Sequence, residues 1–276
     1  MAIAKLIAVV MLLSLTFGAG LQVDREALRS VFKDGWLIAR ALAANVLVVP
    51  LLGVLLARLF ALPAAIATGF LLMAIAPGVP FVLSSVRKRG GSLGLAVALA
   101  LLLPLVSIVT VPITAAFLLP PGAQAHVPLT RFVETLLLFQ ILPLCAGILL
   151  TAKAPAVAMR LVRPLELLFF AAAVALLALI SPQIGRDVVA VYGSHALWAT
   201  FCLVALSLDV GWVMGGAARE SRRVLAIGTA LRNVGLCALI ATANFDDPRI
   251  IATVATYLLV QAAVTTAVGI YFTRTA

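Results

Sequence analysis

The sequence predicts an all-α polytopic membrane protein, and three observations support this fold class. Hydrophobic residues make up 64% of the chain, a much larger share than in water-soluble domains. Apolar runs of about 20 residues, long enough to cross a hydrocarbon core as helices, recur along the sequence. Lysine and arginine residues concentrate in alternate links between these runs, as the positive-inside rule requires of membrane helices.

Nine membrane spans are expected, and their ends are defined to within several residues. They are residues 2–21, 35–60, 63–85, 92–119, 132–152, 164–184, 196–216, 223–244 and 250–272. The first span also resembles a signal peptide, but no soluble domain follows it, which favours a membrane helix.

The basic residues orient these spans. Each of the four odd-numbered links carries three lysines or arginines, whereas each even-numbered link carries one. The charge rule therefore places the N-terminus outside and the C-terminus in the cytoplasm. We expect a multi-pass protein of the plasma membrane.

Two of the spans are interrupted near their middles. In the third span, Pro77, Gly78 and Pro80 break the helical hydrogen-bond pattern within four residues. In the eighth span, Arg232 and Asn233 place a permanent charge and a carboxamide at membrane depth, which marks a candidate functional site. The two spans cross the membrane in opposite directions, as the broken helices of inverted-repeat transporters do. We expect a cavity beside them, although a proline kink is the simpler alternative for the third span.

Polar residues from several spans fall at similar depths. Arg232 lies about 14 Å from the cytoplasmic end of its span, and Asn45 and Gln261 also fall near the midplane. Asp209 lies about 10 Å deep, where a lone carboxylate is costly, so we expect it to pair with Arg232 or Arg40. Such a pair could hold helices together or take part in binding and coupling.

Other classes of protein are not supported by the residues. The chain has none of the GxSxG, HExxH or P-loop motifs, so we expect no enzyme activity. Its three cysteines, Cys145, Cys202 and Cys237, stand alone in apolar runs, which predicts neither a metal site nor a disulfide framework. The positive charge marks cytoplasmic links, so no nucleic-acid partner is expected.

Several motifs, taken in order, resemble the bile acid:sodium symporter family. They are Thr16–Leu21, Val49–Pro50, Ala76–Gly78, Arg89–Gly91, Leu95–Ala98, Arg232–Leu236 and Tyr257–Gln261. The resemblance implies two inverted repeats, divided into a core domain with two crossing broken helices and a panel domain, with substrate bound between them. Repeat one would cover residues 1–119, without the first helix of ten-helix members, and repeat two would cover residues 132–276.

The chain departs from sodium-coupled members of that family at the positions that hold the ion. Asn45 and Asn233 are retained as polar residues. The oxygen-bearing ligands are replaced at Val82, Leu83, Ala96, Ala100, Gly228 and Arg232. We therefore expect no cofactor and no sodium requirement, with the Arg232 guanidinium standing in for the missing cation. The alternative is that one sodium ion binds near Asn45, Asn233 and local carbonyls, with Arg232 extending to the cytoplasmic side.

The sequence thus predicts a secondary active transporter of a small organic anion that works by alternating access in a lipid bilayer, as a monomer or homodimer. Two alternatives remain: a carrier like the auxin-efflux or arsenite-efflux proteins, driven by protons or the membrane potential, and a non-transporting membrane scaffold subunit. The candidate substrate- or ion-binding residues are Asn45, Pro77, Gly78, Pro80, Asp209, Arg232, Asn233 and Gln261.

Overall fold

Helices make up nearly all of the chain that the structure describes. The structure is a computed structural model that describes residues 2–23, 34–78, 86, 90–124 and 129–275, and within these ranges it contains no β-strand. The α-helices are α1 (Ala2–Leu21), α3 (Gly35–Ala43), α4 (Val49–Leu59), α5 (Ala64–Ile75), α7 (Leu93–Leu118), α8 (Pro121–Gln124), α9 (Leu129–Leu136), α10 (Leu142–Lys153), α11 (Pro155–Gly193), α12 (Ala196–Met214), α13 (Arg219–Ala230), α14 (Val234–Asn244) and α15 (Pro248–Arg274). Two π-helical turns, η1 (Ala44–Val48) and η3 (Leu137–Ile141), join α3 to α4 and α9 to α10.

Seven helical segments of the described chain are long and apolar enough to cross a membrane. They match the predicted spans one, two, four, five, six, seven and nine. The helices within predicted spans three and eight are shorter, because α5 has 12 residues and α14 has 11. The link predicted at residues 153–163 is largely helical instead, since α11 already begins at Pro155, followed by residues such as alanine, methionine and leucine that favour helix.

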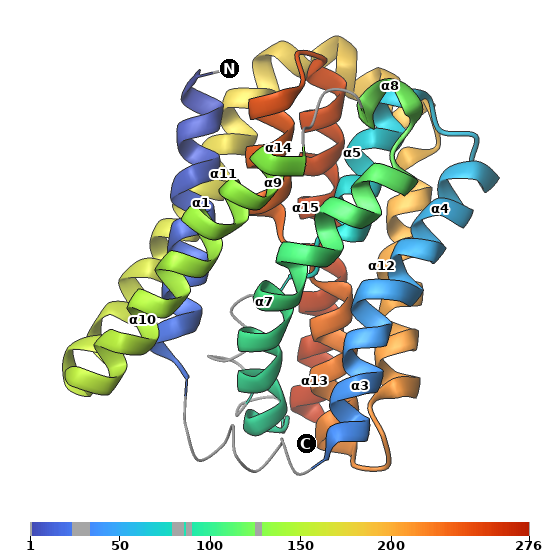
Figure 1. Cartoon of the computed structure of the whole chain (residues 1–276). Helices are drawn as coiled ribbons and strands as arrows, with labels where there is room; N and C mark the ends of the chain where they lie inside the picture. The colour runs from blue at the N-terminus through green and yellow to red at the C-terminus, as the bar shows by residue number, and fades with distance from the viewer. Residues whose placement is uncertain (1, 24–33, 79–85, 87–89, 125–128, 276) are drawn as a thin grey trace.

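Three helices, α1, α10 and α11, pack on one another along one flank of the molecule, and we call them the flank group (Figure 1). Glycines allow the close approach of α1 and α10. A Cβ atom added at Gly147 would lie 2.5 Å from the carbonyl oxygen of Phe17, and one added at Gly20 would collide with the carbonyl of Leu144. Such contacts stabilise helix pairs in lipid by van der Waals packing, because lipid supplies no hydrophobic drive between helices.

The remaining long helices form a second body, which we call the central group: α3, α4, α5, α7, α12, α13, α14 and α15. Gly211 on α12 and Gly215 directly after it face the backbone of α13 closely. A side chain at Gly211 would collide with Leu225, and one at Gly215 would collide with Arg222. The flank group meets the central group mainly where α1 packs against α14 and α11 packs against α15.

The ends of the helices separate the basic residues as the sequence predicts. The N- and C-terminal ends of the chain lie at opposite ends of the molecule (Figure 1). Helix ends carrying Lys153, Arg219 and Arg274 lie near the C-terminal end, whereas those carrying Arg58 and Arg249 lie at the other end. The described helices therefore agree with the charge alternation.

Candidate functional site at the helix crossing

The two interrupted spans meet at their breaks. Helix α5 ends at Ile75, and α13 ends at Ala230. Pro77 and Arg232 then form an isolated antiparallel backbone bridge, and the N–H of Asn233 donates to the Ala76 carbonyl at 3.1 Å. The interruptions predicted at these positions are confirmed, while Pro80 lies outside the described residues.

Gly78 allows the two chains to cross at this distance. A Cβ atom at this position would lie 2.5 Å from the carbonyl carbon of Arg232 and 2.8 Å from the nitrogen of Asn233. Real Cβ atoms essentially never approach backbone this closely, and the backbone of Arg232 cannot rotate away as a side-chain tip could. The crossing therefore requires a residue without a side chain.

Arg232 is the largest fully buried side chain of the described chain, with 2% of its surface exposed. Its backbone N–H donates to Oε1 of Gln261 at 2.9 Å, and its Nη1 donates to the carbonyl of Asn45 at 3.4 Å. The hydroxyl of the buried Tyr257 has no hydrogen-bond partner among the described residues. Nε and Nη2 of Arg232 likewise have no hydrogen-bond partner in the part of the chain that the structure describes. Arg232, Asn45 and Gln261, predicted to share one depth, thus come together.

A π-helical turn explains why Asn45 offers its carbonyl to the arginine. In η1 the N–H of Val49 donates to Ala44, five residues back. The next donor in this pattern would be residue 50, but Pro50 has no N–H, so the carbonyl of Asn45 is left for Arg232. The Asn45 side chain donates to Ala41 at 3.0 Å, and its Oδ1 atom has no partner among the described residues.

Helix ends supply partial charges around the guanidinium. The C-termini of α5 and α13, each equivalent to about half a negative charge, meet here with the N-terminus of α14, which is equivalent to about half a positive charge. The three described ends sum to about −0.5 elementary charge, and this partial charge favours a cation beside them. Arg232 therefore lies where backbone dipoles, rather than a carboxylate, offset part of its charge.

Asp209 does not pair with Arg232, so that prediction is wrong for this conformation. Asp209 lies on the exposed face of α12, whereas the buried face of that helix carries Leu203, Ser207 and Gly211. No ion pair between Asp209 and an arginine of the described chain is found within 4.0 Å. The prediction failed because the Asp209 side chain points away from the buried face of α12.

Gln140 is a buried polar residue that the sequence analysis missed. It lies in η3 with 1% of its surface exposed, and its Oε1 accepts a hydrogen bond from Nδ2 of Asn233 at 3.0 Å. Its Nε2 donates to the carbonyl of Pro104 at 3.0 Å and to Oγ of Ser107 at 2.6 Å. A lone carboxamide in an apolar run is the signal that singled out Asn45, and it could have identified Gln140 as well.

Asn233 is held from two sides. Its Oδ1 accepts from the N–H of Leu236 at 3.1 Å, so the side chain caps the N-terminus of α14. Its Nδ2 donates to Gln140. Asn233 therefore links the start of α14 to the π-turn of a neighbouring helix.

Three of the positions at which sodium-coupled relatives would carry ligand oxygens are apolar in the described chain, while Val82 and Leu83 lie outside the described residues. Ala96 and Ala100 are buried in α7, and Gly228 is buried in α13 with its α-carbon facing Leu99. The described part of the chain contains no group of three or more histidine, cysteine or acidic residues that could hold a metal. Hard cations bind carboxylate, carbonyl or hydroxyl oxygens, which these side chains lack.

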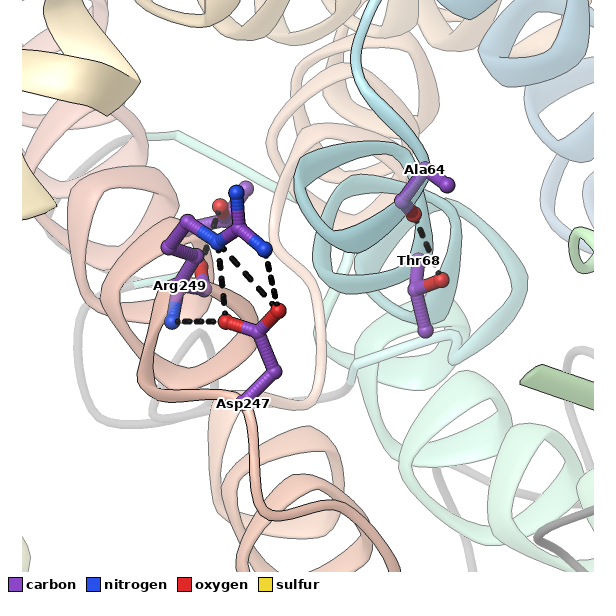
Figure 2. A network of polar contacts seen from close by, with 5 residues as sticks. Ala64, Thr68, Asp247 and Arg249 are labelled. Carbon is purple, nitrogen blue, oxygen red and sulfur yellow. Dashed lines mark hydrogen bonds and ion pairs between the residues drawn. The ribbon is translucent and has the colours of Figure 1, made fainter. Parts of the chain in front are cut away.

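A second polar cluster lies at the ends of α5 and α15, away from the crossing (Figure 2). Asp247 caps α15 and forms an ion pair with Arg249 at 2.6 Å, while Thr68 donates to the carbonyl of Ala64 at 2.8 Å. A pocket of about 340 Å³ opens here, lined mainly by small and apolar residues together with Asp246 and Asp247. The Arg249 side chain, which donates hydrogen bonds to the Asp247 carboxylate, lowers the pKa of that group below its ordinary value.

Comparisons with known proteins match the first two-thirds of the chain to a transporter family. The model of the Sodium Bile acid symporter family matches residues 9–190. The P3 protein of Homo sapiens is 29% identical over 139 residues, and Sodium/bile acid cotransporter 5 of Mus musculus is 27% identical over 154 residues. These matches cover 49% and 54% of this chain, but only 29% and 35% of the two relatives. Gln140 lies inside the matched family segment and Arg232 lies beyond it.

Proposed function

Since the chain belongs to the Sodium Bile acid symporter family, we propose that it is a secondary transporter that carries a small organic anion across a membrane by alternating access. The observation that carries this proposal is the fully buried Arg232 at the crossing of two broken helices. Charged residues inside membrane spans mark ion and substrate pathways, and inverted-repeat carriers bind their ligands at interrupted helices. Family membership itself supports a membrane transporter rather than an enzyme.

The proposed architecture has nine membrane crossings. The seven long segments supply seven crossings, and the broken helices supply two more: α5 with the segment that follows it, and α13 with α14. Repeat one then covers residues 1–119 and repeat two covers residues 132–276. In this scheme the flank group corresponds to a panel domain, the central group to a core domain, and transport to movement of one against the other.

Orientation is tested independently of transport. With the N-terminus outside and the C-terminus in the cytoplasm of a plasma-membrane protein, a reporter fused after Arg274 is cytoplasmic and one inserted at Gly122 is external. The reverse result at either site would contradict the nine-crossing arrangement.

We further propose that transport does not require sodium. The Arg232 guanidinium occupies the crossing as a fixed positive charge. Its Nη1 donates to the carbonyl of Asn45, and Gln261 holds the backbone N–H of Arg232. Fixed in this way, the guanidinium stabilises the crossing and attracts an anion without any ion being bound and released. The apolar residues at Ala96, Ala100 and Gly228 support this view, because a sodium ion would find no side-chain oxygen at these positions.

The experiment begins with a substrate. Thermal stabilisation of the purified protein by a panel of organic anions identifies ligands, because a ligand that binds the folded state raises its stability by mass action. Uptake of the best ligand into proteoliposomes is then measured with sodium, with potassium and with choline as the external cation. Equal uptake in the three media supports the fixed-charge proposal. Uptake that rises steeply with external sodium contradicts it.

The proteoliposome assay also distinguishes the two alternative functions, an efflux-type carrier and a membrane scaffold. Uptake that follows an imposed pH gradient or membrane potential indicates a carrier that resembles auxin-efflux or arsenite-efflux proteins. A scaffold subunit would show no uptake under any of the imposed gradients. The same vesicles therefore separate all three functions.

A further inference from the structure

We infer that Gln140 is a clasp between the two helix groups, and that its hydrogen bonds hold the crossing in the conformation described here and break when the groups move. This inference rests on the proposed function, because it assumes that the flank and central groups move relative to each other. It assigns a role to Gln140 and to its contact with Asn233, neither of which the proposed function uses.

The position of Gln140 between the groups is the first argument. Its π-turn η3 contacts α1, a helix of the flank group, on one side and α7, a helix of the central group, on the other. Below the turn, α10 continues into the flank group, whereas α9 above it packs against α7. The helix that contains Gln140 thus passes from one group to the other at the level of this residue.

The direction of its hydrogen bonds is the second argument. The three side-chain partners of Gln140 are Asn233 at the crossing and Pro104 and Ser107 in α7, and all belong to the central group. With 1% exposure, these bonds are shielded from water. Breaking them without replacement leaves buried polar atoms unpaired, which is costly in a membrane interior.

The neighbouring contact between the groups is of a different kind. Where α1 meets α14, Gly235 lies against the backbone of Leu12, and a Cβ atom added at Gly235 would lie 2.9 Å from the Leu12 nitrogen. Such a contact between a glycine and backbone depends on shape and allows sliding, whereas the amide bonds of Gln140 have fixed partners. The clasp therefore defines two kinds of state. In one, the hydrogen bonds of Gln140 are intact; in the others, Asn233 Nδ2 is available to another acceptor, such as an oxygen of the substrate.

The local turn offers a matched control. Oγ1 of Thr16 in α1 donates to the carbonyl of Phe139 at 3.3 Å, next to Gln140 in the same π-turn. This bond ties η3 to the flank group and not to the central group. Thr16→Val therefore removes a hydrogen bond from the same turn without opening the clasp.

The test measures the distance between the groups without substrate. Spin labels are placed at Leu149→Cys on α10 and Val213→Cys on α12, both exposed. Cys145→Ala and Cys202→Ala remove the two more accessible native thiols, and the buried Cys237 is kept. Double electron–electron resonance then gives the distance distribution for the wild-type background, Gln140→Leu, Ser107→Ala and Thr16→Val.

Gln140→Leu is expected to raise the population of a second separation by about tenfold relative to the wild type, on the scale of several membrane hydrogen bonds lost together. Ser107→Ala, which removes one partner, gives a smaller change in the same direction, and Thr16→Val matches the wild type. If Gln140→Leu does not fold, the smaller shift of the distance distribution in Ser107→Ala still tests the clasp. An unchanged distribution in every folded clasp variant, or an equal change in Thr16→Val, would overturn the inference. Because no substrate is needed, a failure of transport would not alter this result.

Discussion

Two arginines in the second half of the chain, Arg232 and Arg249, carry the same charge in very different surroundings. Arg249 lies at the start of α15 with 45% of its side chain exposed and is paired with Asp247. Arg232 is buried and has no carboxylate partner among the described residues. Its guanidinium donates to the carbonyl of Asn45, and its backbone N–H donates to Gln261. Water already solvates the first charge, so its ion pair adds little to stability. The stabilisation of the Arg232 charge depends on the geometry of the crossing. Substitutions at the crossing should therefore change stability and transport more than substitutions at Arg249 or Asp247.

The largest effect is expected from Gly78→Ala, which disrupts the crossing itself. The added methyl would lie 2.5 Å from the backbone of Arg232, and such overpacking typically costs about 1–3 kcal/mol. Thermal unfolding of the purified protein in detergent measures the loss. Gly122→Ala is the matched control, because a Cβ there meets nothing within 4 Å. Equal unfolding temperatures for the two variants would contradict the close approach at Gly78.

Arg232→Gln should reduce transport by at least about tenfold in any salt, a loss equivalent to about 1.4 kcal/mol. The glutamine keeps a polar side chain but removes the charge that the helix ends favour. Initial uptake into proteoliposomes, normalised to reconstituted protein, gives the comparison. Arg249→Gln is the control and should stay within twofold of the wild type. Normal, sodium-dependent uptake by Arg232→Gln would refute the fixed-charge proposal.

Asp209→Asn should change transport by less than about twofold, because Asp209 forms no ion pair among the described residues that the substitution could break. This variant tests the expectation from the sequence that Asp209 pairs with Arg232 or Arg40. A loss as large as that of Arg232→Gln would show that the two residues meet in another conformation of the transport cycle. The uptake assay for Arg232→Gln also measures this variant.

Asp247→Asn should have the smallest effect, about 0.2–1 kcal/mol of unfolding free energy at pH 7. Asparagine still caps α15, so the variant isolates the charge. The folded pKa of Asp247 lies below its unfolded value of about 3.9, so the stabilisation is present above that value. It is lost as the pH falls through the folded pKa. Thermal unfolding of both proteins from pH 7 to pH 3 checks this, and a difference that grows on acidification would contradict the sign.

The sequence was sufficient to place the breaks and the depth of the polar residues. Pro77 and Gly78 cannot continue a helix smoothly, and Arg232, Asn45 and Gln261 were found together because each lies near the middle of its span. Depth follows from counting residues along an axis at a fixed rise.

Rotation around the helix axis was harder to predict. Asp209 faces away from Arg232, and the sequence of α12 could not predict this direction. Apolar residues lie on most sides of the helix, so no clear polar face indicates which way each side chain points. Gln140 was missed for a related reason. Its partners, Pro104 and Asn233, lie far away in sequence, and only the packing of α9 and α10 against α7 and α14 brings them together.

The π-turn η3 also makes the length of its helix critical. Each residue turns an α-helix by about 100°, so positions four apart drift by about 40°, and a wider turn absorbs part of this drift. Buried residues follow one another at intervals of four, at Phe132, Leu136, Gln140 and Leu144. Deleting a single residue of η3, even the exposed Leu138, would rotate the side chains of α9 relative to those of α10. For this helix the number of residues is therefore as strict a requirement as their chemistry, and a one-residue gap would do more harm than most substitutions.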